Sequence, residues 1–451
     1  MVVHKFSSSS RVKEYEGYID LHYKPSKNDL VCEYYLEPAK GISFESACQR
    51  VASESSIGTW TDIGTLSQKM FDELSPKIFF LDRKKNIVKI AYSKELFEER
   101  NVSQILSSVA GNIFGMSDVN NLRLIDIDLP ECFIKHYSGP HYGISGVRYL
   151  MREKNRPFVG TIVKPKLGLD EKGHARVAYE AWLGGCDYVK DDENLTSMSF
   201  NNYYKRVNET LRARNKAERE TGEKKAYLAN VTAPYNEMVR RAKHVVAHGG
   251  EFVMVDVLTV GWSALQELRD MDLKLVYHGH RAMHAAFTRN PKHGVSMIVI
   301  AKLCRLIGLD QLHVGGMVGK MYEREEDVRT VGEEIEHKVV HSHLATHRLK
   351  EEWHDLKPMF AVCSGGLHPA KVAPIIHALG RDVIIQAGGG IHGHPNGTFA
   401  GAKAMRQAVD AEMLGISAQE YAKTHSELHA ALQKWGGLNF YERHHVKLRS
   451  K

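Results

Sequence analysis

The stretch GGCDYVKDDEN (residues 184–194) contains the pattern that decides the fold of this chain. A short apolar run, Cys186 to Val189, ends directly in four charged residues, Lys190 to Glu193. A polar bend and then a helical segment follow before the next apolar run begins. This order is typical of one strand–helix unit of a parallel sheet.

The same unit recurs through the chain from Phe158 onward. The apolar runs are residues 158–163, 186–189, 226–231, 252–258, 274–278, 311–314, 359–363 and 383–387. Eight strands that alternate with helices over about 250 residues predict a parallel sheet closed into a (β/α)8 TIM barrel. An open, doubly wound sheet is the structural alternative, but eight repeats favour closure. Residues 417–435 are predicted to form additional helices.

The region before the barrel has a different order of elements. Strands are predicted at residues 30–37, 77–82, 86–92 and 122–129, and helices at 43–55, with Ser43 as the cap, and at 94–108. The order β-α-β-β-α-β is that of a smaller, ferredoxin-like α+β domain. We therefore predict an N-terminal domain over residues 1–139 and a catalytic barrel domain over residues 140–451.

Composition excludes several classes of protein. A hydrophobic content of 43% and a charged content of 25% argue against a disordered, fibrous or coiled-coil chain. No apolar run reaches the roughly 18 residues that span a bilayer, and the first residues lack the apolar stretch of a secretion signal, so we expect a cytoplasmic protein without a membrane partner. The six cysteines form no zinc-type pairs and are expected to be buried thiols. The net charge of +7 comes from interspersed acids and bases, which favours a phosphorylated substrate over a nucleic acid.

Charged or glycine-rich residues follow six of the eight predicted barrel strands. In a barrel of this type, the active site lies at the carboxyl ends of the strands. One such ending carries little information, but six at the same rim predict a site. The six endings are Lys164 with Lys166, Lys190 to Glu193, His278 to His284, the glycine-rich loop that reaches Lys320, Ser364 to Gly366, and Gly388 to Gly390.

The second predicted strand carries the strongest signal. Alternation along the strand places Lys190 and Asp192 on one side, and Glu193 follows where the pleat ends. Two carboxylates and an amine suit magnesium poorly, because this ion prefers about six oxygen ligands. If the amine of Lys190 condenses with CO2, the resulting carbamate supplies a third anionic oxygen ligand. A solvated ion-pair cluster is the alternative for such a run, but the position directly after a buried strand favours a metal site.

Carbamate formation requires a neutral lysine, whose ordinary pKa is about 10.4. The nearby cations Lys164, Lys166 and Arg281 are expected to lower the pKa of Lys190, whereas the adjacent carboxylates oppose this effect until a metal binds. We therefore expect CO2 and magnesium to bind cooperatively.

Other rim residues are suited to anions. Glycine-rich loops after the seventh and eighth strands form the usual phosphate site of these barrels, although plain turns are the alternative. Arg281, His313 and Lys320 are available for a second phosphate. His280 and His284 are one helical turn apart and are expected to act on one ligand, although a buried core histidine is the commoner structural role.

These motifs resemble those of ribulose-1,5-bisphosphate carboxylase/oxygenase (RuBisCO) large subunits over nearly the whole chain. The matching segments are GTIVKPKLGL (160–169), GGCDYVKDDENLTS (184–197), HGHRAMHAAFTRNPKHG (278–294), SGGLHP (364–369), GGGIHGHP (388–395), ESSIGTW (54–60) and GNIFGM (111–116). The amino-acid sequences of several of these segments are most similar to those of archaeal-type form III enzymes. That form implies a role in nucleotide salvage and no small subunit.

The resemblance implies a reaction and a role for each matching residue. Lys190 would be carbamylated and would bind Mg²⁺ together with Asp192 and Glu193. The carbamate would take the C3 proton of ribulose 1,5-bisphosphate, and the enediolate, stabilised by magnesium, would react with CO2 or O2. Carboxylation then yields 3-phosphoglycerate. Lys164 is implied as the final proton donor, with Lys166 tuning it.

The remaining substrate contacts are also implied by the resemblance. His280 would bind the substrate hydroxyls and assist proton transfer, and Lys320 would close over the new carboxylate. Arg281, His313, Gly365, Gly366, Gly388 and Gly389 would hold the two phosphates, with His284 also at the substrate and Ser364 at a sugar hydroxyl. Glu54, Thr59, Trp60 and Asn112 would complete the site of a partner chain, which implies a homodimer or an assembly of homodimers.

Five positions depart from the common family pattern. They are Gly316, Tyr322 with the following Glu323, Ile57 and Ile162, and they bear on loop closure and CO2/O2 selectivity. Two alternative functions remain: a RuBisCO-like enolase or isomerase that acts on a phosphorylated sugar, and a phosphosugar-binding protein without catalysis. The presence of the full implied substrate set, including Lys164 and Lys320, favours the carboxylase.

Overall fold

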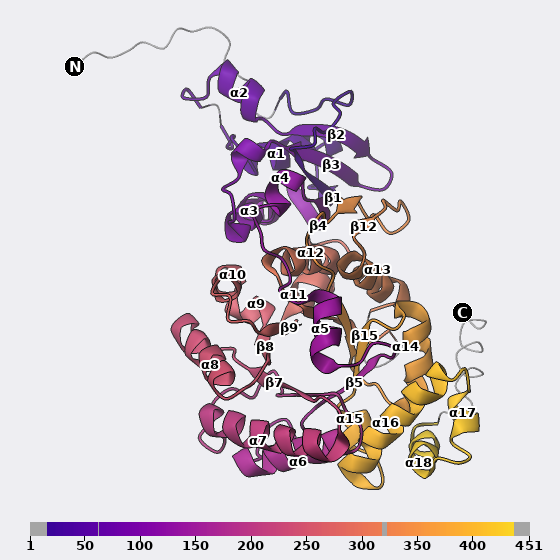
Figure 1. Cartoon of the computed structure of the whole chain (residues 1–451). Helices are drawn as coiled ribbons and strands as arrows, with labels where there is room; N and C mark the ends of the chain where they lie inside the picture. The colour runs from indigo at the N-terminus through magenta and orange to yellow at the C-terminus, as the bar shows by residue number, and fades with distance from the viewer. Residues whose placement is uncertain (1–15, 62, 318–322, 437–451) are drawn as a thin grey trace. The chain divides into compact units, whose positions relative to one another are not determined.

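The computed structural model describes residues 16–61, 63–317 and 323–436, which form two compact units (Figure 1). The first unit contains the chain up to Tyr137 together with Met283–Leu303 and Lys338–Leu356. The second contains Ser138–Ala282, Cys304–His337 and the chain from Lys357 onward. Two segments from the later part of the chain therefore belong to the first unit. A domain boundary between residues 139 and 140 stays a proposal.

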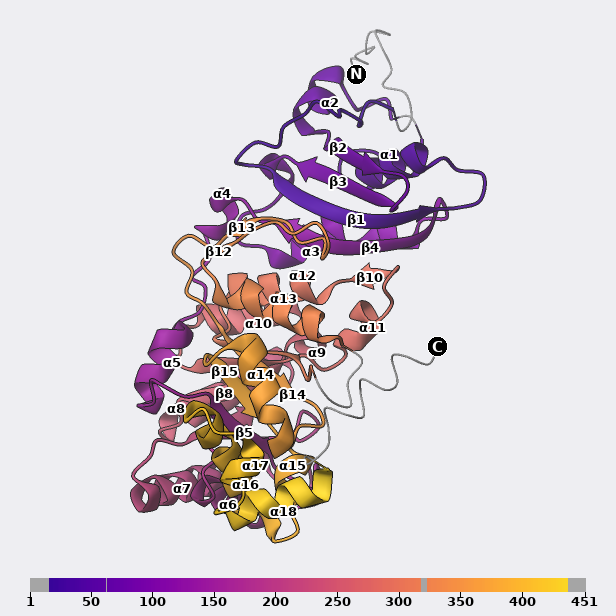
Figure 2. The ribbon, with the colours of Figure 1, turned by 90° about the vertical axis from the view of Figure 1, so that its right-hand side faces the viewer.

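A five-stranded sheet organises the first unit, in the order β10-β4-β1-β3-β2. Strands β1 (Leu30–Pro38), β2 (Lys77–Asp82), β3 (Ile87–Tyr92) and β4 (Val119–Asp128) pair antiparallel, and the short β10 (Gly294–Val295) pairs parallel with β4. Helices α1 (Phe44–Glu54) and α3 (Val102–Val109) complete the β-α-β-β-α-β order. Figure 2 shows β1 lying between β3 and β4. The prediction of a ferredoxin-like domain is confirmed.

Two local predictions in this unit differ from the structure. The predicted helix over residues 94–108 is divided into a 3-10 turn, η1 (Lys94–Leu96), and helix α3. Helix α3 begins late because the Asn101 side chain accepts a hydrogen bond from the Gln104 backbone N–H at 2.9 Å and caps it there. Helix α2 (Gln68–Leu74), which Ser67 caps, was not predicted from the sequence. The predicted cap at Ser43 is confirmed.

The second unit is a closed barrel of eight parallel strands, as predicted. The strands are β5 (Phe158–Ile162), β6 (Tyr188–Lys190), β7 (Ala226–Asn230), β8 (Phe252–Asp256), β9 (Val276–His280), β11 (Gln311–Gly315), β14 (Phe360–Ser364) and β15 (Val383–Gln386). Side chains such as Phe158, Tyr188, Phe252 and Phe360 fill the inside near the start of these strands. Since side chains alternate along a strand, a residue two positions after Tyr188 faces the same interior at the carboxyl end.

Helices lie before, between and after the strands of the barrel (Figure 1). They are α5 (Gly143–Met151), α6 (Glu171–Leu183), α7 (Tyr203–Thr221), α8 (Tyr235–Ala247), α9 (Val257–Val260), α10 (Trp262–Asp270), α13 (Glu325–Glu336), α14 (Val372–Leu379), α15 (Gly389–His392) and α16 (Gly397–Met413). The predicted C-terminal helices are present as α17 (Ala418–Tyr421) and α18 (Ser426–Trp435).

The remaining elements of the described chain are η2 (Asn112–Gly115), α4 (Glu131–Ile134), α11 (His284–Thr288), α12 (Met297–Ile307), β12 (Val339–Val340), β13 (Glu351–Glu352) and η3 (Pro369–Lys371). None of the helices within the described ranges is both long and apolar enough to cross a membrane.

Candidate active site

Lys190 is the last residue of β6 and lies inside the barrel with only 1% of its surface exposed. Its Nζ donates to the Asp191 carbonyl oxygen at 2.8 Å and lies 4.0 Å from Glu193 Oε2. Burial lowers the pKa of Lys190 below its ordinary value, against the opposing effect of the nearby carboxylates. The predicted direction of this shift is therefore correct, but its main cause is loss of solvent rather than neighbouring cations.

Two lysines from the loop after β5 hold the carboxylates beside Lys190. Lys164 Nζ donates to Asp192 Oδ2 at 2.7 Å, and Lys166 Nζ lies 3.3 Å from Glu193 Oε1. Burial alone would raise the pKa of Asp192, but the hydrogen bond and charge of Lys164 lower it. The structure thus brings together five of the six charged residues that the sequence predicted at the ends of the first two strands, and Asp191 is the exception.

Asp191 points to the opposite side of β6 and belongs to a separate buried cluster. Its carboxylate lies 3.1 Å from Arg206 Nη2 and 3.1 Å from His174 Nε2, and it accepts a hydrogen bond from Tyr227 Oη at 2.8 Å. Burial would raise the pKa of Asp191, but Arg206 and His174 lower it well below its usual range. Alternation along the strand explains this division: Asp192 faces the site, whereas Asp191 anchors the strand from behind.

Two residues of the site were missed by the sequence analysis. The Asn230 side chain, at the end of β7, donates to the carbonyl oxygens of Asp192 and Glu193 at 3.3 and 3.2 Å, which orients the loop after β6. Asp256, at the end of β8, lies 2.8 Å from His280 Nδ1. Both occupy the carboxyl end of a strand, but each lies inside a predicted apolar run (226–231 and 252–258), so the search for residues that follow a run did not include them.

His280 lies between two carboxylates at the end of β9. Its Nδ1 is held by Asp256, and its Nε2 lies 3.8 Å from Glu193 Oε2. Burial, with a smaller contribution from the Lys190 charge, lowers the pKa of His280 to about 3. Burial also raises the pKa of Asp256 to about 6. The imidazole is therefore neutral, fixed in orientation and directed at the carboxylates of the site.

A row of hydrogen-bonded side chains crosses the barrel beside these residues. His278 Nε2 lies 2.8 Å from His313 Nε2, and His313 Nδ1 lies 2.7 Å from Ser364 Oγ. Both ring nitrogens of His313 therefore have partners inside the barrel. The role of His313 at a phosphate stays a prediction.

Arg281 was expected to meet a phosphate. Its Nη2 donates to Glu323 Oε1 at 2.6 Å, and both side chains are more than nine-tenths buried. A phosphate would have to compete with this carboxylate or bind beside the pair. Arg281 remains a predicted substrate residue, while Lys320 lies outside the described residues.

The glycine-rich endings adopt conformations that favour glycine. Gly365 and Gly366 after β14 have φ angles of 107° and 72°, which side chains rarely allow. A side chain at Gly388, after β15, would meet Lys164 Cε at 3.1 Å, whereas the same position on Gly389 faces open space. These two loops therefore leave backbone exposed at the barrel rim, as a phosphate cradle requires.

The remaining predicted residues belong to the first unit. Trp60 is 75% exposed, Asn112 is exposed, and Glu54 and Thr59 are partly exposed. His284, at the start of α11, lies 3.0 Å from Thr288 Oγ1 through its Nδ1. Four of these side chains are thus available to a neighbouring chain, and their substrate roles stay predictions.

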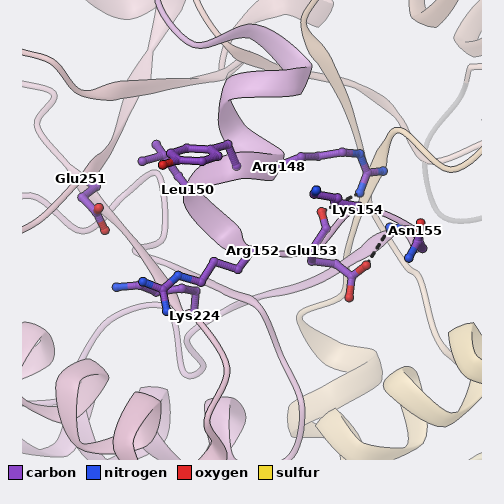
Figure 3. Close-up of a pocket in the computed structure, with 9 residues that line it drawn as sticks. Arg148, Leu150, Arg152, Glu153, Lys154, Asn155, Lys224 and Glu251 are labelled. Carbon is purple, nitrogen blue, oxygen red and sulfur yellow. Dashed lines mark hydrogen bonds between the residues drawn. The ribbon is translucent and has the colours of Figure 1, made fainter.

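A hollow of about 630 Å³ lies at the other end of the barrel, where the strands begin (Figure 3). Its lining comes from the end of α5, from the segment between α5 and β5, and from residues just before β7 and β8, including Arg152, Lys224 and Glu251. It contains none of the predicted site residues. We therefore place the candidate site at the carboxyl-end rim, where the reactive side chains lie, and not in this hollow.

The barrel and its rim define the class of this protein: a (β/α)8-barrel enzyme whose site sets a buried lysine beside two carboxylates. Two family models match the chain. The ribulose bisphosphate carboxylase large chain catalytic domain matches residues 143–435, and the corresponding N-terminal domain matches residues 17–133. The chain therefore belongs to the ribulose bisphosphate carboxylase (RuBisCO) large-chain family, which confirms the resemblance.

Known proteins from archaea are similar over almost their full length. Ribulose bisphosphate carboxylase of Methanosarcina acetivorans is 52% identical over 93% of this chain and 98% of the relative. The Pyrococcus abyssi enzyme is 46% identical over 96% of this chain and 99% of its own length.

Solved structures agree with the described fold. An octameric RuBisCO from Pyrococcus horikoshii, in complex with sulfate, has a TM-score of 0.89 and 44% identity, covering 96% of this chain and 99% of that one. A dimeric archaeal RuBisCO from Hyperthermus butylicus has a TM-score of 0.88 and 44% identity, covering 94% and 100%. The predicted enzyme class, ribulose-bisphosphate carboxylase, is that of these relatives.

Proposed function

We propose that this chain carboxylates ribulose 1,5-bisphosphate to 3-phosphoglycerate, with O2 as a competing substrate. The observation that carries the proposal is the buried Lys190 beside Asp192 and Glu193 at the carboxyl end of β6. Family membership supports the same reaction. A RuBisCO-like enolase or isomerase is the second candidate, because it would use the same lysine and carboxylates.

The side chains at the site fit a magnesium ion and an activating CO2 molecule. Magnesium prefers about six oxygen ligands, and Asp192 and Glu193 supply carboxylate oxygens. Among the described residues, no group of three or more histidine, cysteine, aspartate or glutamate side chains could hold a metal. A carbamate on Lys190 would add the missing oxygen ligand, and the lowered pKa of Lys190 favours the neutral amine that reacts with CO2. When bound, the ion would supply positive charge that stabilises the enediolate oxygens.

The chain's own residues would then divide the proton transfers. Lys190, once carbamylated, would accept the C3 proton of the substrate. His280, held by Asp256 at 2.8 Å, would bind a substrate hydroxyl with a fixed ring orientation. Lys164 would deliver the last proton, and Lys166 would adjust the proton affinity of Lys164. Both lysines already lie against the carboxylates of the site.

The rest of the rim would bind the substrate's ends. The exposed backbone of Gly365, Gly366, Gly388 and Gly389 would hold one phosphate, and Arg281 with His313 would lie at the other. Ser364 would contact a sugar hydroxyl, and His284 would also lie at the substrate. Lys320 would close over the newly formed carboxylate.

We propose a homodimer, or an assembly of homodimers, as the active form. Glu54, Thr59, Trp60 and Asn112 would complete the partner's site, and no small subunit is expected. The dimeric and octameric archaeal relatives support this proposal. A role in nucleotide salvage and a cytoplasmic location are also proposed, and the six free cysteines suit a reducing compartment.

One assay tests this function. Purified protein is preincubated with CO2 and magnesium and then given ribulose 1,5-bisphosphate with labelled bicarbonate. We expect acid-stable label in 3-phosphoglycerate that depends on preincubation and is lost in Lys190→Ala. A matched control is Lys225→Met, which removes another buried lysine, at the start of β7, and should keep the dependence on preincubation. Absence of label under every preincubation would favour the isomerase.

A further inference from the structure

Five side chains form one continuous hydrogen-bonded row through the inside of the barrel. Gln311 Nε2 donates to Tyr188 Oη at 3.2 Å, and Gln311 Oε1 lies 2.8 Å from His278 Nδ1. His278 Nε2 then lies 2.8 Å from His313 Nε2, and His313 Nδ1 lies 2.7 Å from Ser364 Oγ. The first four are fully or almost fully buried, whereas Ser364 is partly exposed at the carboxyl end of β14. The row thus connects the packed interior with the rim.

The orientation of Gln311 fixes the direction of every hydrogen bond in this row. Its Oε1 can only accept, so the hydrogen must be on His278 Nδ1. Burial lowers the pKa of His278 to about 3, so its ring is neutral and its Nε2 must accept. The hydrogen between the two rings therefore belongs to His313 Nε2.

The same reasoning extends to the rim. Burial lowers the pKa of His313 well below its ordinary value, so this ring is also neutral and its Nδ1 must accept. The hydroxyl hydrogen of Ser364 therefore points inward, toward His313. The Ser364 oxygen keeps its lone pairs for the site, and it can accept a hydrogen bond but has no hydrogen left to donate.

We propose that Gln311 is a positioning residue that, through His278 and His313, makes Ser364 an obligate acceptor for a substrate hydroxyl. The inference rests on the proposed function for the identity of the substrate. It also changes the role of His313, which acts through Ser364 instead of donating to a phosphate. Specificity follows, because a ligand group must bring its own hydrogen to Ser364.

A double-mutant cycle tests the coupling between the two ends of the row. Gln311→Met keeps the size of the side chain but removes its polar atoms, and Ser364→Ala removes the acceptor. We expect Gln311→Met to lower kcat/KM for ribulose 1,5-bisphosphate by roughly tenfold, the scale of one directed hydrogen bond, in the wild-type background. In the Ser364→Ala background the further loss should be under about twofold.

A matched control separates positioning from simple packing damage. Gln386, on neighbouring β15, is also fully buried, and its side chain has no hydrogen-bond partner within the described parts of the chain. Gln386→Met should therefore change kcat/KM by the same factor with and without Ser364→Ala. Equal losses from Gln311→Met in both backgrounds, or no loss at all, would overturn the proposal.

A second measurement does not depend on activity. Neutron crystallography of the perdeuterated protein locates ring hydrogens directly, and we expect deuterons on His278 Nδ1 and His313 Nε2. A deuteron on His278 Nε2 would reverse the row and refute the inference. An inactive wild type would instead refute the proposed function, while the neutron result would still decide the direction of the row.

Discussion

Asp191 is adjacent to the site residue Asp192 in the sequence, yet its carboxylate lies in a separate buried cluster behind β6, so the loss of its charge should lower the stability of the fold. Asp191→Asn removes a buried negative charge without changing the size of the side chain. Arg206 would keep its hydrogen bonds to Asn201 Oδ1 and the Thr196 carbonyl oxygen, both at 2.8 Å, but it would lose its counter-charge. Breaking one side of a buried ion pair typically costs about 3–5 kcal/mol. Because Arg206 keeps two acceptors, we expect about 3 kcal/mol.

Urea unfolding of the full chain, followed by circular dichroism, measures this loss. Asp187→Asn is the matched control, because Asp187 binds Arg156 through two hydrogen bonds of 2.7 Å in a pair that is also buried, although slightly more exposed. Asp187 lies just before β6, whereas Asp191 lies just after it. Both variants should be less stable, but Asp191→Asn alone should also weaken activation by CO2 and magnesium, because the Asp191 side chain anchors the end of β6, where the backbone carbonyl of residue 191 accepts a hydrogen bond from Lys190. Wild-type stability of Asp191→Asn, or equal loss of activation in Asp187→Asn, would refute this reasoning.

Three further predictions concern other parts of the barrel. Burial, with nearby carboxylates, raises the pKa of Glu336 to about 7. The folded protein therefore binds this proton more tightly than the unfolded chain does, and the free energy of unfolding falls as the pH rises from about 4.5 through 7. Glu336→Gln should therefore stabilise the protein at pH 8 by about 1–2 kcal/mol, reduced for partial exposure, and by almost nothing at pH 4.5; an equal melting-temperature shift at both values would contradict this. Asp256→Asn should lower kcat/KM roughly 10- to 100-fold while CO2 activation persists, since His280 loses its charged partner; unchanged kcat/KM would argue against that role. Gly390→Ala should fold poorly, because its Cβ would lie 2.0 Å from a backbone oxygen, whereas Gly389→Ala, with open space, should fold normally and raise KM; the reverse order of stability in thermal unfolding would exclude this account.

The sequence predicted the barrel and the main residues of its site because both depend on local order. Each strand is a short buried run, and the residue after it lies at the rim whatever the rest of the chain does. Period-two alternation also correctly separated Lys190 and Asp192 from Asp191. Five of the six cysteines are buried, in line with the expected buried thiols, and Cys132 is partly buried.

Features that depend on distant partners were not predictable in the same way. Asp256 was hidden within the predicted apolar run 252–258, and only the structure places it against His280. The partner of Arg281, Glu323, follows a loop whose course the sequence does not specify. The cause of the lowered Lys190 pKa was also missed, because the degree of burial is set by the closed barrel and not by the neighbouring residues in the chain.

The charges at the mouth of the barrel give a physical reason for the proposed joint activation by CO2 and magnesium. Lys164 and Lys166 already balance Asp192 and Glu193, and burial favours the neutral form of Lys190. A carbamate on Lys190 would add an uncompensated negative charge about 4 Å from a carboxylate, which is costly in a buried site. A divalent cation without the carbamate would find only two anionic ligands, each already bound to a lysine. Each partner therefore removes the cost of binding the other, so we infer that raising magnesium lowers the CO2 concentration needed for half-activation, and that raising CO2 does the same for magnesium.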